Sequence, residues 1–350
     1  MRRIIISLVL LTAVACSDGT APNAGTFDRE RVREGIAIVE RAANSKALSS
    51  LHAITRFVGD VGAASASSSL GWSGELETVA RKLGASAVDA GTALIPVMRA
   101  SVLGKTFVFD PGAKKYVVDA ARTGAPSSGV RFILYEVDPN ENPVPGQEIG
   151  HADLTDERRS STSTAGIRLE VVLGGVTQLT YSFDLSGSVE RAEFAVFGYV
   201  KDGSDRLDFS IETSQQLFAR GGAAMLEAKL YVAQEDFEVT ARLAGTAGEE
   251  NADGSVDLTI RSKLDEIIVD AETVEGVLDA TFTVNGQLLA TANGDPKAPV
   301  VRGAGGRALS DEEVQVLHGI VEMAGGIFAF VSALLAPAGV LLLVALGIGG

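Results

Sequence analysis

The chain has 350 residues, enough for one large or two ordinary domains, and its 46% hydrophobic content excludes a wholly disordered protein. The formal net charge of −15 repels phosphate groups, so no nucleic acid partner is expected. The single cysteine, Cys16, cannot form an internal disulfide.

The first residues have the layout of a secretory signal. Arg2 and Arg3 precede an apolar run at 4–15, which is too short to span a bilayer as a stable helix. Residues 1–15 are therefore predicted to be a signal peptide, and the small, polar residues 16–25 a tether.

The cleavage region reads Ala13-Val14-Ala15-Cys16. Small residues before a cysteine resemble the lipobox of bacterial lipoprotein precursors, and the resemblance is confined to this leader. It implies that Cys16 carries acyl chains such as palmitate. The protein would then lie in the cell envelope, on the outer membrane or the periplasmic face of the inner membrane. The alternative is ordinary cleavage after Ala15 with a free thiol at Cys16.

Residues 26–104 are predicted to form a helical region. A first helix begins at Asp28 and ends at Asn44-Ser45, and a second follows it; their apolar stripes are Val32, Ile36, Val39 and Ala43, then Leu48, Leu51, Ile54 and Val58. Residues 59–74 are rich in Gly, Ala and Ser and indicate a loop, and 75–103 indicate a third helix.

Residues 105–296 are predicted to form an antiparallel β domain. Pro111-Gly112 marks a hairpin between 106–110 and 115–119, and three prolines indicate a loop at 138–146. Apolar and polar residues alternate from 167 to 294, and the breaks include Asp202-Gly203, Asp253-Gly254 and Asn285-Gly286. The expected fold is α+β, mainly antiparallel β. It is a large curved meander sheet or half-barrel covered by the N-terminal helices and a C-terminal apolar helical segment.

Residues 297–323 are predicted to be a linker followed by an amphipathic helix. Ser310 and Glu313 form a capping box at its start. Residues 324–350 carry no charged side chain, and Pro337-Ala338-Gly339 interrupts them. Two interpretations stay open: a transmembrane segment, or a buried hairpin of two short helices.

The three histidines, His52, His151 and His318, are far apart, in a predicted helix, loop and helix. His151, Asp153 and Asp156 could suggest a metal site, but they lack specific ligand spacing, and a polar loop is favoured.

An acidic segment around Asn251, Asp253 and Asp257 superficially resembles a calcium loop. Ile260 occupies the place where a bidentate Glu is needed, so a hairpin turn is favoured. The glycines from Gly303 to Ala308 fit a dinucleotide-binding pattern by letter only, since no βαβ unit surrounds them; a flexible linker is expected.

No nucleophile, base or cofactor motif is evident, so we expect a non-enzymatic envelope lipoprotein without a cofactor. Its expected partners are a membrane, reached through the lipid anchor and in one interpretation the C-terminal segment, and a lipid or other apolar ligand in the curved sheet. The alternative is a structural or interaction protein of the envelope with a fully packed core. An enzyme is the third hypothesis, since carboxylate sites leave no signature in this sequence.

Overall fold

The computed structural model describes residues 29–57, 98, 100–140, 142–157, 165–187, 191–216, 223–246 and 253–345. The predicted signal peptide, the tether with Cys16, the loop at 59–74 and Asn251 lie outside these residues. The chain divides into two compact units. Among the described residues, unit 1 comprises 29–40 and 211–331, and unit 2 comprises 41–210 and 332–345.

The described residues form fifteen strands in one large, mostly antiparallel sheet. The strands are β1 (Lys105–Asp110), β2 (Lys115–Val118), β3 (Gly129–Val137), β4 (Pro143–Asp156), β5 (Ala165–Leu173), β6 (Val176–Gly187), β7 (Arg191–Asp202), β8 (Asp205–Gln216), β9 (Ala223–Val232), β10 (Phe237–Thr246), β11 (Asp253–Ser262), β12 (Asp265–Val274), β13 (Val277–Val284), β14 (Gln287–Gly294) and β15 (Val300–Gly303). The order is sequential from β15 to β3, which confirms the predicted meander, and ends with β1 and β2.

The start of the sheet differs from the prediction. β1 and β2 form the expected antiparallel hairpin, but β1 also pairs in parallel with β3, with Phe107 opposite Phe132. The sheet is therefore mixed. The segment after β2 brings the chain back to the N-terminal end of β1. β3 therefore runs in the same direction as β1.

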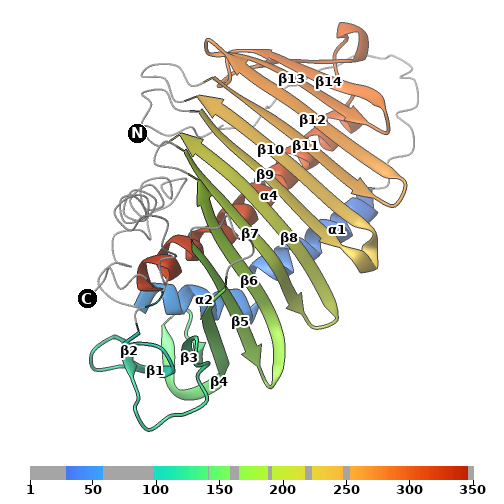
Figure 1. Ribbon diagram of the computed structural model, residues 1–350. Helices are drawn as coiled ribbons and strands as arrows, with labels where there is room; N and C mark the ends of the chain where they lie inside the picture. The colour runs from blue at the N-terminus through green and yellow to red at the C-terminus, as the bar shows by residue number, and fades with distance from the viewer. Residues whose placement is uncertain are drawn as a thin grey trace. The chain divides into compact units, whose positions relative to one another are not determined.

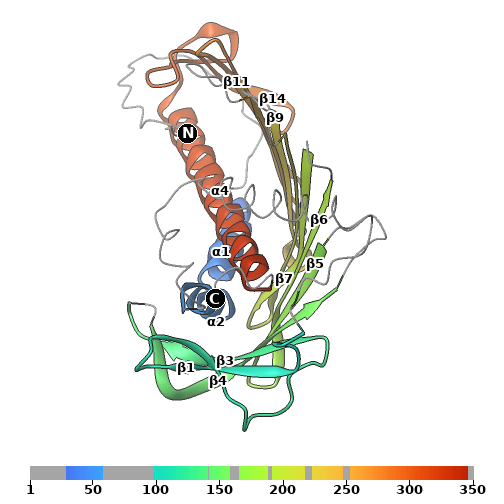
Figure 2. The same ribbon diagram turned by 60° about the vertical axis from the view of Figure 1, so that its left-hand side comes forward.

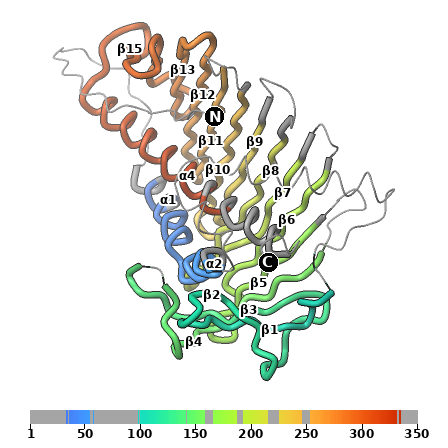
Figure 3. Tube along the Cα trace, turned by 90° about the vertical axis from the view of Figure 1, so that its left-hand side faces the viewer, coloured from blue at the N-terminus to red at the C-terminus, as the bar shows by residue number. Residues whose placement is uncertain are grey.

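Unit 1 contains the regular part of the meander, and Figures 1 and 3 show β9 to β13 as successive neighbours. Alternation places Phe237, Val239 and Ala241 on the buried face, each at 0% exposure. At the turn between β13 and β14, Asn285 and Gly286 both have positive φ (51° and 74°), as a tight hairpin requires.

One predicted turn in unit 1 is misplaced. Asp253-Gly254 was expected between two strands, but both residues pair within β11, opposite Thr246 and Gly245. The residues that connect the two strands, 247–252, lie outside the described residues. A Cβ at Gly254 would lie 3.0 Å from the Ala244 carbonyl oxygen, so the strand is closely packed against β10 at this position.

Unit 2 contains α2 (Lys46–Phe57), which contacts β3, β5 and β6 and lies beside β3 in Figure 2. The Ser45 hydroxyl accepts a hydrogen bond from the Leu48 N–H (3.3 Å) and caps this helix. Leu48, Leu51 and Ile54 are fully buried, as their spacing predicts. The preceding helix, α1 (Arg29–Ala43), ends where Asn44-Ser45 predicted a break.

Three sequence boundaries are wrong. Residues 100–103 form turns rather than the end of a third helix. β4 begins at Pro143 inside the predicted loop, because a proline at the first residue of a strand removes no interior ladder bond. The predicted linker contains β15 and a 3₁₀ turn, η3 (Ala304–Gly306). A second 3₁₀ turn, η2 (Ala233–Glu235), connects β9 to β10.

The C-terminal helix, α4, runs unbroken over Asp311–Ala345. Of the two interpretations of the apolar segment, the hairpin at Pro337-Ala338-Gly339 is therefore wrong, and no boundary separates 311–323 from the apolar segment. Its buried side chains lie on one helical stripe on both sides of that expected boundary, at separations of three, four or seven residues: Leu317, Ile320, Ile327, Phe330, Val331 and Leu334. By length and composition, Asp311–Val331 of this helix could also cross a membrane.

Candidate functional site

His151, Asp153 and Asp156, for which a polar loop was favoured over a metal site, lie on strand β4 of unit 2. His151 and Asp153 are on β4, but Arg131 of β3 pairs with both carboxylate oxygens of Asp153 at 2.7 Å. His151 Nε2 lies 3.8 Å from the same carboxylate. Burial lowers the pKa of His151, and the charge of Arg131 lowers it further. The carboxylate is thus occupied by a cross-strand ion pair.

The acidic-turn residues do not converge in unit 1. Asp253 Oδ1 accepts a hydrogen bond from the Glu275 backbone N–H at 2.8 Å. Asp257 lies four residues further along β11, about 13 Å away at strand spacing. Two carboxylates that far apart cannot bind one ion, whose ligands lie about 2.4 Å from it. The described residues contain no group of three His, Cys, Asp or Glu placed to hold a metal.

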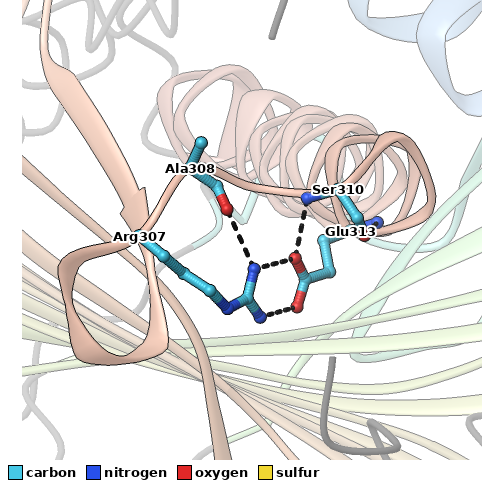
Figure 4. A network of polar contacts seen from close by, with 4 residues as sticks. All are labelled: Arg307, Ala308, Ser310 and Glu313. Atoms are coloured by element: carbon cyan, nitrogen blue, oxygen red, sulfur yellow. Dashed lines mark hydrogen bonds and ion pairs between the residues drawn. The ribbon is translucent and has the colours of Figure 1, made fainter. Parts of the chain in front are cut away.

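The glycine-containing segment before α4 is a structured clasp rather than a flexible linker (Figure 4). The Arg307 guanidinium donates to both carboxylate oxygens of Glu313, at 2.7 and 2.5 Å, and to the Ala308 carbonyl at 2.9 Å. Gly303 leaves room for this guanidinium, since an added Cβ would lie 3.0 Å from Arg307 Nη1.

The same carboxylate completes the predicted capping box. Ser310 donates its N–H to Glu313 Oε2 (2.9 Å), and its hydroxyl accepts from the Glu313 N–H (3.3 Å). The hydrogen bonds from Arg307 are the main cause that lowers the pKa of Glu313 to about 2. Glu313 therefore stays ionised although the residue is buried, with only 8% of its surface exposed.

We expect this clasp to make stability depend on acid pH. Because the pKa of Glu313 falls on folding, its contribution is complete above about pH 5 and is lost as the pH falls towards 2. With allowance for the partly exposed Arg307, wild type should lose on the order of 2 kcal/mol more over this range than Glu313→Gln. Urea unfolding at a series of pH values measures the difference. Glu312→Gln, which leaves the clasp intact, is the control and should follow wild type; parallel curves for Glu313→Gln and wild type would contradict the assignment.

A polar contact that the sequence did not indicate lies in unit 2. Tyr181 of β6 is fully buried and donates its hydroxyl hydrogen bond to the Leu334 carbonyl at 2.7 Å. His52 of α2 places Nε2 at 3.4 Å from the Ala333 carbonyl. Pro337 in the sequence indicates that a helix here lacks one backbone donor, so a carbonyl needs a donor from another element. The sequence does not identify that donor. The remaining histidine, His318, faces Glu322 one turn along α4 at 3.1 Å.

One apolar row in unit 1 is only half-buried. Leu226, Leu243, Val256 and Ala271 face one another in register across β9 to β12; we term them the Leu243 row. In the next row on the same face, Ala228, Ala241 and Leu258 are at most 1% exposed and Val269 is 8% exposed. The apolar face is therefore incompletely covered at this end of the strands.

No protein-family model, no curated protein and no solved structure matches this chain.

Proposed function

We propose that the protein is an exported lipoprotein of the cell envelope, anchored by acyl chains on Cys16, that holds an apolar ligand on its sheet without catalysis. The lipobox-like leader supports the anchor. The half-buried Leu243 row is the observation that carries the ligand proposal. Exposed apolar surface that a helix or strand does not cover is a common mark of a binding surface.

The ligand we propose is an acyl chain. The Leu243 row crosses four neighbouring strands, about 14 Å at the spacing of a sheet, and carries only aliphatic side chains. A straight hydrocarbon chain lying across the strands would contact all four side chains. In this proposal the sheet is curved as a half-barrel, with helices over its apolar face within each unit.

A packed structural core is the second candidate, and unit 2 favours it. Leu169, Tyr181, Phe183 and Val196 lie on neighbouring strands at 1% exposure or less. A face filled to this degree leaves no room for a ligand, and the protein would then act through its outer surface. The two candidates differ in whether the Leu243 row is occupied in the cell.

Lipid extraction separates the two candidates. The full chain carrying Cys16→Ala, which has no covalent acyl chain, is purified without detergent, extracted with organic solvent and examined by mass spectrometry. We expect about one acyl lipid for each chain, and a several-fold loss in Leu243→Gln, because a buried amide without a partner disfavours an apolar contact.

The matched control is Ala244→Gln, the next residue on β10, which is exposed on the opposite face. It should keep the lipid. A folded Cys16→Ala chain that yields no lipid would refute the ligand proposal and leave the packed-core candidate.

A further inference from the structure

Pro337 lies inside α4 and alters its hydrogen bonding. Proline has no backbone N–H, so the carbonyl four residues earlier, that of Ala333, receives no hydrogen bond from position 337. That carbonyl therefore lacks its usual donor in the helix, and the Leu334 carbonyl lies beside it in the same turn. In an apolar interior such groups need donors from elsewhere.

Two side chains of unit 2 are placed at these two carbonyls. His52 Nε2 lies 3.4 Å from the Ala333 carbonyl, and Tyr181 donates to the Leu334 carbonyl at 2.7 Å. Because a carbonyl can only accept, Nε2 of His52 carries the proton in this contact. The two donors belong to α2 and β6. His52 is 281 positions from Ala333 in the chain, and Tyr181 is 153 positions from Leu334.

The sheet is shaped to hold the Tyr181 ring. Gly198 lies opposite Tyr181 in the register of β6 and β7. A Cβ at Gly198 would lie 1.9 Å from the Thr180 carbonyl oxygen and 3.1 Å from the Phe209 ring. The Phe209 ring in turn lies 6.1 Å from that of Tyr181. The phenol is therefore fixed by packing, and its hydroxyl is directed at the Leu334 carbonyl of α4.

We infer that His52 and Tyr181 form a docking site for the Pro337 turn of α4, so that the apolar C-terminal part of this helix is an internal element of unit 2 and not a membrane span. A proline-containing span in a bilayer takes its replacement donors from neighbouring spans, Ser or Thr side chains or water. Here the donors belong to α2 and a strand of the sheet. Leu334, the residue that accepts from Tyr181, is itself fully buried.

A double-mutant cycle tests the site in the full chain carrying Cys16→Ala. His52→Leu and Tyr181→Phe each remove a donor and keep an apolar side chain, and each should raise the unfolding constant in urea by about tenfold. Pro337→Ala returns an N–H to the Ala333 carbonyl. The effect of His52→Leu should therefore fall to about twofold or less in the Pro337→Ala background.

Tyr199→Phe is the control for loss of a hydroxyl, because Tyr199 lies on the other face of β7 and contacts Arg206; it should change the unfolding constant less than twofold. If His52→Leu has the same effect with Pro337 and with Ala at that position, the proposed site is wrong.

A second measurement does not depend on the stability of the variants. Tyr181 is replaced in cells by p-benzoylphenylalanine, and the chain is irradiated and digested with trypsin. No Lys or Arg follows Arg307, so α4 is recovered within one peptide. We expect a cross-link from position 181 to this peptide. Cross-links to lipid or to other proteins instead would overturn the inference.

Discussion

A chain that ends at Gly325 is expected to aggregate or remain unfolded. The truncation removes Ile327, Phe330, Val331 and Leu334, which are between 0 and 3% exposed. Each buried side chain of this size contributes about 2 kcal/mol, so their sum is comparable to the net stability of a typical domain, about 5–15 kcal/mol. Soluble yield and circular dichroism of the purified chain measure the outcome.

A chain that ends at Ala345 is the matched control, because it keeps all of α4. It should stay folded, with a melting temperature close to that of the full chain. The truncation at Gly325 also distinguishes the two interpretations of the apolar segment. A soluble, folded chain with unchanged melting temperature would mean that the removed residues are a membrane tail and that the docking site at His52 and Tyr181 is not used.

Replacing Cys16 is expected to remove the protein from the membrane. Each buried methylene of an acyl chain contributes about 0.8 kcal/mol to membrane binding, and two or more chains hold a protein firmly where one does not. Cys16→Ala should abolish incorporation of labelled palmitate. The mature wild-type chain should have the mass of residues 16–350 plus its acyl groups. Ser17→Ala, next to the modified residue, is the control and should be labelled like wild type.

Local patterns predicted the local structure well. Alternation of apolar and polar residues indicated the strands of the meander, because one face of each strand is buried and the other is exposed to solvent. Asn285-Gly286 predicted a tight turn because both residues tolerate positive φ. Ser310 and Glu313 predicted the start of α4, since a capping box is a contact between residues three positions apart.

Contacts between distant residues could not be predicted in this way. The parallel pairing of β1 with β3 depends on the path of the chain after β2, which carries no periodic signal. The clasp of Arg307 on Glu313 lay in a segment whose glycines indicated flexibility. Tyr181 lies in the alternating segment 167–294, and that pattern does not indicate an acceptor 153 residues away.

The sequence and the structure differ in what Pro337 does to the helix. In the sequence it indicated a break, because proline lacks the donor that an uninterrupted helix needs. In the structure the helix continues to Ala345, and the carbonyls of Ala333 and Leu334 contact His52 and Tyr181. A helix tolerates proline when its surroundings supply replacement donors, and those surroundings are set by the tertiary fold.

Alkaline extraction of membranes from cells that express Cys16→Ala tests the central claim most directly. An internal α4 and a lipid anchor at Cys16 together predict that wild type stays with the membrane and that the variant is recovered in the soluble fraction. A Cys16→Ala chain that resists extraction as firmly as wild type would contradict the docked helix, because a second attachment to the membrane would then remain.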